Sequence, residues 1–278
     1  CSIYSQDISQ KSSSFLRLNL ILNNLVHSIP NAIQGNTIKD PYHKENNKIK
    51  LFDFIVSNPP FKTDFSNYRN DLETKENRSR FFAGIPKIPP KDKKKMEIFL
   101  LFIQHIISSL SKNGKAAIVV PSGFLKSKSI GQIIRKYLIE NKMLTGVISM
   151  PKNIFANTGT RVSIMFIDKE SVNDDPIFIN ATKLGTPVKE GDNEKTVLSL
   201  EEEKLITSTF KKSLAKENFS IKVSEAEIIK KKYSFSAGDY MFVKIDYSEM
   251  SKTEFDEKIK FSKKKIKELN EDSKKLDD

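Results

Sequence analysis

Cysteine and histidine are scarce in this sequence of 278 residues. Cys1 is the only cysteine, so we expect neither a disulfide framework nor a cysteine-based zinc site. The three histidines, His27, His43 and His105, lack the spacing of metal ligands, and we expect no metal. The longest apolar run, at 98–110, is interrupted by polar residues and is too short to span a membrane, and no signal peptide is visible. We therefore expect a cytoplasmic protein with no membrane partner.

Basic residues outnumber acidic ones, with 47 Lys and Arg against 35 Asp and Glu and a formal net charge of +12. This excess favours a polyanionic partner such as nucleic acid, although a lysine-rich solvated surface would give the same composition. The length suits one large domain, or one domain with an appendage. The chain begins with Cys1 rather than Met and continues into Ile3-Tyr4, which resembles the end of a strand. We expect it to be part of a longer protein, or one half of a split one.

The stretch at 51–61, LFDFIVSNPPF, is the main landmark. Its apolar start is typical of a strand buried on both faces. Pro59 and Pro60 have no backbone donor and a fixed φ, so the strand must stop there. Asn58 is therefore expected at the carboxyl end of a strand, which is the edge where α/β sheets bind ligands, with Phe61 just beyond it. The alternative is an ordinary strand followed by a proline-rich turn.

Apolar periodicity predicts alternating helices and strands, and hence a mostly parallel α/β sheet. The strand at 147–150 and the one at 162–167 are expected to pair antiparallel at a sheet edge, and Asn113-Gly114 is expected to close a helix. The predicted helices lie at 15–25, 96–110 and 130–140, and the predicted strands at 51–56, 116–120, 147–150 and 162–167. The expected domains are 1–170 (α/β sheet), 171–245 (mixed α/β extension) and 246–278 (C-terminal helix).

A polar, basic segment at 62–95 separates two of these elements. A structureless loop of this length is often functional. Its basic and aromatic residues suit a phosphate backbone and unstacked bases, and a mobile solvated loop is the alternative. The residues in question are Arg69, Arg78, Arg80, Phe81, Phe82 and Lys93-Lys94-Lys95.

The C-terminal part carries helix signals. Ser199 with Glu202, and Ser224 with Glu227, form predicted capping boxes. From Met250 onward the sequence is rich in Lys and Glu and predicts a helix with a coiled-coil-like stripe. That stripe favours a partner-binding helix, and a surface helix lying on its own domain is the alternative. Its apolar members are Phe255, Ile259, Ile266, Leu269 and Leu276, with Ser262 and Ser273 filling the seam.

An amide next to two prolines suggests a specific chemistry. The Asn58 Oδ1 atom and the Pro59 carbonyl can both accept hydrogen bonds from one exocyclic amino group. Phe61 offers a flat apolar face on which a base can stack. These features suit methyl transfer to the amino group of a base that has left the duplex, a reaction that depends more on positioning than on a strong base.

These residues, together with several flanking stretches, resemble the modification (M) subunit of type I restriction-modification systems, an N6-adenine DNA methyltransferase family. Asn58-Pro59-Pro60-Phe61 resembles the amino-methyltransferase signature, and the other stretches occur in the family's order. They are IYSQDI at 3–8, RLNL at 17–20, GNT at 35–37, FD at 52–53, GKAAIVVP at 114–121, MPKNIFANTGT at 150–160 and YSFSAGDY at 233–240.

The resemblance implies a Rossmann-like sheet for the cofactor S-adenosyl-L-methionine, with an α-rich C-terminal extension. The expected first strand and its glycine-rich loop are missing, so the chain looks N-terminally truncated and inactive alone. Asp7 would accept from the cofactor's ribose hydroxyls, and Asn36 stands near its adenine, where the family usually has Asp. Phe155 would supply a second aromatic against the flipped base. The residues implied at the cofactor are Asp7, Ile8, Asn36, Thr37 and Asn58, and those implied in catalysis are Asn58, Pro59, Pro60, Phe61 and Phe155.

The partners implied by the resemblance are double-stranded DNA with a flipped adenine, a specificity subunit, a restriction subunit and a separate N-terminal M fragment. Two alternatives stay open. A similar Asn-Pro-Pro turn serves methyltransferases acting on protein glutamine or RNA guanine. A non-catalytic scaffold that docks through its C-terminal helices would also account for the missing glycine loop.

Overall fold

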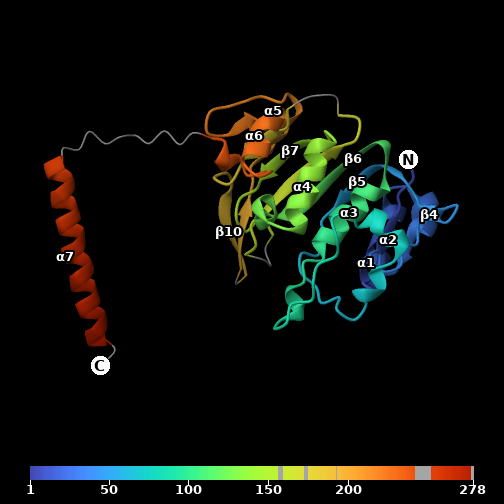
Figure 1. Cartoon of the computed structure of the whole chain (residues 1–278), viewed down its shortest axis with the longest axis horizontal. Helices are drawn as coiled ribbons and strands as arrows, with labels where there is room; N and C mark the ends of the chain where they lie inside the picture. The colour runs from blue at the N-terminus through green and yellow to red at the C-terminus, as the bar shows by residue number, and fades with distance from the viewer. Residues whose placement is uncertain (156–158, 172–174, 192, 242–251, 277–278) are drawn as a thin grey trace. The chain divides into compact units, whose positions relative to one another are not determined.

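A computed structural model describes residues 1–155, 159–171, 175–191, 193–241 and 252–276 (Figure 1). The chain divides into two compact units, Cys1–Met241 and Phe242–Asp278. The second unit contains helix α7 (Lys252–Leu276), which confirms the predicted C-terminal helix. No helix within these ranges is both long enough and apolar enough to cross a membrane.

A six-stranded sheet forms the centre of the first unit, in the order β12-β9-β7-β8-β6-β5. Its strands are β5 (Phe52–Ser57), β6 (Leu110–Pro121), β7 (Leu144–Ser149), β8 (Val162–Asp168), β9 (Ile177–Asn180) and β12 (Ser220–Lys222). Only the pairs β5–β6 and β7–β9 are parallel, so the prediction of a mostly parallel sheet is wrong. The antiparallel pairing of β7 with β8 is confirmed, but both strands lie inside the sheet and not at its edge.

Three smaller sheets have two strands each. The strands β1 (Ser5–Asp7) and β2 (Ala32–Gln34) are parallel and are joined through α1 (Gln10–Leu22) and the short helix η1 (Val26–Asn31). The other two sheets are antiparallel. They are formed by β3 (Lys44–Glu45) with β4 (Lys48–Ile49) and by β10 (Thr186–Glu190) with β11 (Asn193–Val197).

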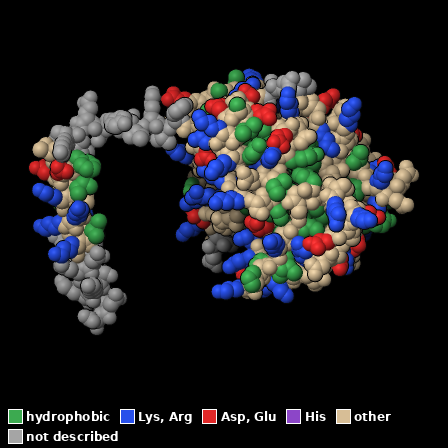
Figure 2. Space-filling view, viewed as in Figure 1, with side chains coloured by type: hydrophobic (Ala, Val, Ile, Leu, Met, Phe, Trp, Pro, Cys, Tyr) green, Lys and Arg blue, Asp and Glu red, His purple; other side chains and the backbone are tan. Residues whose placement is uncertain are grey.

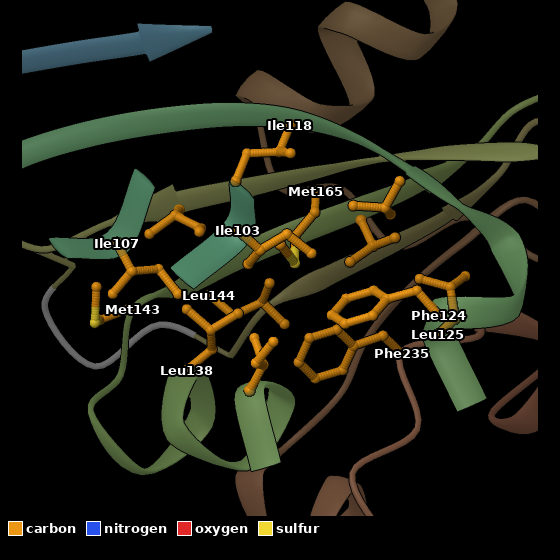
Figure 3. Close-up of a cluster of buried hydrophobic side chains, with 14 of the residues drawn as sticks. Ile103, Ile107, Ile118, Phe124, Leu125, Leu138, Met143, Leu144, Met165 and Phe235 are labelled. Carbon is orange, nitrogen blue, oxygen red and sulfur yellow. The ribbon is translucent and has the colours of Figure 1, made fainter. Parts of the chain in front are cut away.

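The main core lies between the six-stranded sheet and the helices α3 (Phe99–Ser109) and α4 (Ile130–Glu140). Figure 3 shows Ile103 and Ile107 of α3, Leu138 of α4 and Ile118 of β6 turned toward one another. The α4 bounds match the prediction because its apolar positions recur at helical spacing. The helix expected at 96–110 is shorter, and the expected Asn113-Gly114 turn lies inside β6.

Strand β5 is not buried on both faces, so this prediction is wrong. The Ile55 side chain is partly buried and packs on the main core. Phe54 and Val56, which point to the other face, are 78% and 84% exposed. The reason is that β5 is the last strand of its sheet and no described helix covers this face.

The segment at 62–95 is folded, so the prediction of a structureless loop is wrong. It contains the short helices η2 (Asn70–Leu72) and η3 (Lys93–Lys95) and the helix α2 (Lys75–Arg80). Thr74 caps α2 by accepting a hydrogen bond from the Asn77 amide at 3.2 Å. The segment contributes to a separate core cluster consisting of Ile38, Phe65, Leu72, Phe81, Met96, Ile98 and Leu101.

Helix α1 confirms a predicted helix, but its apolar residues Phe15, Leu18 and Leu22 are exposed. Both predicted capping boxes are confirmed. Ser199 and Glu202 begin α5 (Leu200–Lys211), and the second box begins α6 (Glu225–Lys230).

A buried arginine fixes the end of the first unit to its core. Arg135 of α4 donates a hydrogen bond to the Tyr233 carbonyl at 2.7 Å and to the Ser127 carbonyl at 2.6 Å. The Phe235 amide donates to the Leu125 carbonyl at 3.0 Å. Leu125 lies in η4 (Ser122–Lys126) and Ser127 directly follows it. Phe235 precedes η5 (Ala237–Asp239). The residues just before the second unit are therefore held in place.

Candidate active site

Asn58 lies directly after β5, as predicted, and its side chain is exposed. Pro59 is buried, which fixes the turn, whereas Pro60 is exposed. Asn58 has no side-chain hydrogen bond within the part of the chain that the structure describes. Its amide is therefore available to a ligand at the carboxyl end of a strand, next to the Pro59 carbonyl.

Phe61 is anchored on the main core. Its ring lies 6.4 Å from the ring of Phe99 at an interplanar angle of 78°, and Phe99 in turn packs against Phe124 at 5.9 Å. These edge-to-face contacts fix the orientation of a half-buried aromatic ring three residues after Asn58.

Asp7 is the last residue of β1, where the resemblance placed an acidic strand end. Its Oδ1 atom accepts a hydrogen bond from the Ser9 amide at 2.7 Å, and Ser9 caps α1. This bond orients the carboxylate and leaves Oδ2 without a hydrogen-bond partner among the described residues. The neighbouring Ile8 is 70% exposed. One oxygen thus has a structural role and the other remains free for a ligand.

Asn36 and Thr37 follow β2 and are already engaged by the protein. The Asn36 Oδ1 atom accepts from the Ile38 and Lys39 amides, each at 3.0 Å. The Thr37 hydroxyl donates to the Gln6 carbonyl at 3.0 Å. Any ligand contact by Asn36 therefore falls to its amide nitrogen.

Arg80 stabilises the turn after β2 by hydrogen bonds to its backbone, a role that the sequence did not reveal. It is buried and donates hydrogen bonds to the Thr37 carbonyl at 2.6 Å, the Ile38 carbonyl at 2.8 Å and His105 Nδ1 at 3.1 Å. Burial lowers the pKa of Arg80 to about 10. Burial, together with the Arg80 charge, lowers the pKa of His105 to about 3, so the imidazole stays neutral and accepts this hydrogen bond.

The prediction that Arg80, Phe81 and Phe82 face nucleic acid is therefore wrong. Arg80 and Phe81 are buried, and the Phe82 ring packs 4.3 Å from that of Tyr137. The apolar residues Phe65 and Leu72 were the available signal that this segment has its own core. Arg78 and the three lysines of η3 are exposed.

Phe155 lies in the connection between β7 and β8 and is 38% exposed. Asn153 ties this connection to the β10–β11 hairpin. Its carbonyl accepts from the Thr196 amide at 2.9 Å, and its Nδ2 donates to Glu194 Oε2 at 3.3 Å. The following residues 156–158, part of the motif at 150–160, lie outside the described ranges.

The predicted site residues form separate groups in this structure. Among the described residues, no hydrogen bond or ring contact joins Asn58 to Asp7, Asn36 or Phe155. The small and large sheets do meet at their amino ends, where the rings of Tyr4 and Phe52 lie 5.3 Å apart. No group of His, Cys, Asp and Glu suited to a metal ion occurs within the described ranges.

A mixed sheet flanked by helices, with an Asn-Pro-Pro-Phe turn that exposes Asn58 at a strand end, defines an α/β protein with a candidate ligand site at that end. The family described as N-6 DNA Methylase matches residues 1–249. The chain belongs to this N-6 DNA methylase family.

Similar curated proteins are type I restriction enzyme methylase subunits. The MpnII subunit of Mycoplasma pneumoniae is 27% identical over 262 residues, which cover 93% of this chain and 46% of the relative. The MjaIX subunit of Methanocaldococcus jannaschii is 30% identical over 218 residues, covering 76% of this chain and 36% of the relative. The chain thus spans half or less of the length of these relatives.

The fold is also that of a solved structure, the methyltransferase subunit of a type I restriction-modification system from Streptococcus thermophilus. The two share 24% identity with a TM-score of 0.69, over 85% of this chain and 48% of the other.

Proposed function

We propose that this chain is the catalytic part of an S-adenosylmethionine-dependent DNA adenine-N6 methyltransferase, acting as the M subunit of a type I restriction-modification complex. The observation that carries this proposal is the exposed amide of Asn58 after β5, in a chain that matches the N-6 DNA methylase family over residues 1–249. The shared length with type I methylase subunits supports the assignment to this complex.

In this proposal Asn58 Oδ1 and the Pro59 carbonyl accept the two N–H groups of the adenine amino group. That arrangement aims the nitrogen lone pair away from the acceptors and toward the methyl group to be transferred. Phe61, held by Phe99, and Phe155, on its tied loop, would stack on the extruded base. Pro60, exposed beside Pro59, completes the rigid turn.

The described residues fit the cofactor in part. The free Oδ2 of Asp7 suits the ribose hydroxyls, and Ile8 and Thr37 lie next to the two strand ends. Asn36 fits less well, because its Oδ1 is already occupied by two backbone amides. When bound, S-adenosylmethionine supplies the electrophilic methyl group.

Three partners belong to the proposal: double-stranded DNA with a flipped adenine, a specificity subunit and a restriction subunit. The net charge of +12 supports the first. Figure 2 shows apolar side chains among lysines on α7, and Phe255, Ile259 and Ile266 are exposed there. The side chains of Leu269 and Leu276 lie outside the described ones. This stripe supports a subunit contact through 246–278. We also propose that 1–170 is the catalytic domain and that 171–245 is an extension.

We further propose that the chain is inactive alone and requires a separate N-terminal fragment. Tritiated methyl transfer into adenine-containing DNA tests this, with the chain, the polypeptide encoded directly ahead of it and a specificity subunit combined in turn. Incorporation only in the complete mixture is the expected result. Incorporation by the chain alone would contradict the requirement. No incorporation in any mixture would favour a scaffold, and transfer to RNA or protein instead of DNA would favour the other methyltransferase classes.

Asn58→Ala tests the proposed chemistry in the active mixture. Losing one preorganised hydrogen-bonding group should lower the methylation rate about 100-fold or more. Asn67→Ala, which changes another exposed asparagine after β5, is the matched control and should leave the rate within about twofold. Because Asn58 is exposed, the urea midpoint of both variants should equal that of the wild type. A rate for Asn58→Ala close to that of the control would refute the role of Asn58.

A further inference from the structure

Three segments leave the six-stranded sheet at the same edge. The strands β6 and β7 are both antiparallel to β8 and hence parallel to each other, while β5 is parallel to β6 and β9 is parallel to β7. The carboxyl ends of β5, β7 and β9 therefore share one edge. Asn58 follows β5, the connection that carries Phe155 follows β7, and the β10–β11 hairpin follows β9. The hairpin thus starts from the same edge as the candidate site.

The two edges of this hairpin differ. Thr196 in β11 is paired with Pro187 in β10. The Thr196 amide donates to the Asn153 carbonyl at 2.9 Å, outside the hairpin, so this pair is of the type without mutual hydrogen bonds and its backbone groups point outward. Proline has no N–H to offer at the outer edge of β10. The β11 edge is therefore the one that meets the Phe155 connection.

A side-chain hydrogen bond supports the same contact. Asn153 Nδ2 donates to Glu194 Oε2 at 3.3 Å, and since a carboxylate can only accept, the amide nitrogen must face it. Asn153 has a φ of 53°, in the left-handed region that asparagine adopts more readily than most residues. The backbone and the side chain of Asn153 are thus both held by β11, two residues before Phe155.

The hairpin is itself fixed at its base. The amide of Gly185, just before β10, donates to Glu202 Oε1 of α5 at 2.7 Å. Leu184 and Leu198, which flank the hairpin, pack against a buried cluster that includes Ile148 of β7. The hairpin is therefore attached to the same core as the strand from which the Phe155 connection starts.

We propose that the β10–β11 hairpin fixes the position of the Phe155 ring, with Asn153 and Glu194 as positioning residues. The inference rests on the proposed function, in which Phe155 stacks on a base held at Asn58. The strands β8 and β6 lie between β7 and β5, so these strand ends are three strand spacings apart, roughly 14 Å. The ring must project across the edge to reach that base, and a displaced anchor would misplace it.

A tryptophan in place of Phe155 reports on the contact without cofactor or DNA. The chain contains no tryptophan, so Phe155→Trp gives a single fluorescent probe at a partly exposed position. In this background Asn153→Asp places two carboxylates together and should raise acrylamide quenching and shift the emission to longer wavelength. Adding Glu194→Gln restores a donor opposite an acceptor and should reverse both changes.

Asn47→Asp is the matched control for the added charge. Asn47 is exposed, has a φ of 62° and lies between β3 and β4, ahead of the amino end of β5 and so away from the carboxyl edge. This variant should change neither the quenching nor the emission. The urea midpoints of all variants should match that of their Phe155→Trp parent, because the exchanged groups lie near the surface.

The same substitutions in the protein with Phe155 connect the contact to the reaction. In the mixture that methylates DNA, Asn153→Asp should lower kcat about three- to tenfold, the effect of one hydrogen bond. KM for DNA should stay within about twofold, because the contacts that bind the duplex are unchanged. Adding Glu194→Gln should restore most of kcat.

Unchanged fluorescence in Asn153→Asp would overturn the inference, and so would an equal change in Asn47→Asp. A fluorescence change that Glu194→Gln fails to reverse, or that leaves kcat unaffected, would overturn it too. No methylation in any mixture, with the fluorescence changes as expected, would refute the proposed function and with it the catalytic part of the inference. Because the fluorescence requires neither cofactor nor DNA, the two failures are distinguishable.

Discussion

Replacing Arg80 by Met should cost the first unit a large share of its stability. The guanidinium donates hydrogen bonds to two backbone carbonyls of the turn after β2 and to His105. Methionine keeps an apolar stem of similar reach but leaves all three acceptors without this donor. The effect should fall on the turn at 36–39 as well as on the whole unit.

The size of the effect follows from two opposing contributions. Hydrogen bonds from a charged donor contribute roughly 1.5–3 kcal/mol each, so three of them contribute roughly 5–9 kcal/mol. Burial opposes this, since the fall of the Arg80 pKa from its ordinary value to about 10 corresponds to about 3 kcal/mol against the charged form. We expect Arg80→Met to lower the free energy of unfolding by about 2–6 kcal/mol, a large fraction of the stability of an ordinary domain.

Urea unfolding, together with amide exchange at Ile38 and Lys39, measures both effects. These two amides donate to Asn36 Oδ1 and should exchange faster in the variant. Arg78→Met, two positions earlier on the exposed side of α2, is the control and should change the free energy of unfolding by less than about 0.5 kcal/mol. An Arg80→Met protein as stable as this control, with unchanged exchange at 38–39, would refute the supporting role of Arg80.

Three further predictions concern stability. Gly146→Ala should lower the free energy of unfolding by about 2–4 kcal/mol, because the added Cβ would lie 2.5 Å from the Ile177 carbonyl oxygen. Gly123→Ala, with open space around the added Cβ, is the control and should be nearly neutral. Urea unfolding measures both variants, and equal stability of the two would contradict the prediction. His105 stays neutral in the folded protein down to pH about 3, whereas in the unfolded chain it binds a proton below pH about 6.5. The free energy of unfolding should therefore fall as the pH drops from 6.5 toward 3, by at most about 1.4 kcal/mol per pH unit from this group. His105→Gln should flatten this pH profile of the urea midpoint. Ser199→Ala removes a helix cap and should cost about 1 kcal/mol in thermal or urea unfolding, and no change would contradict its capping role.

Local patterns predicted single elements well. The helix α4 has the predicted bounds because its apolar positions follow the helical period, and two capping boxes marked the starts of α5 and α6. The end of β5 just before Asn58 could likewise be predicted, because proline stops a strand through its own covalent geometry.

Long-range packing could not be predicted in this way. An apolar run such as that of β5 has the same sequence whether neighbours cover one face or two, so the exposure of Phe54 and Val56 was missed. Arg80 looked like a surface cation because its acceptors are backbone carbonyls 42 and 43 residues away, and backbone atoms leave no mark in a sequence. The same limit applies to the candidate site. Each strand end could be predicted separately, but the distances between the strand ends depend on how the strands pair in the sheet.

The Arg135 contact has a consequence for how the protein is made. Its acceptor, the Tyr233 carbonyl, lies 98 residues further along the chain. At 5–20 residues per second, a ribosome takes about 5–20 s to reach Tyr233 after it has added Arg135. Throughout that interval the Arg135 guanidinium of the nascent α4 lacks one of its hydrogen-bond acceptors. The main core must therefore either stay open until the end of the first unit emerges or close temporarily around a guanidinium that is bonded to Ser127 but lacks its Tyr233 acceptor.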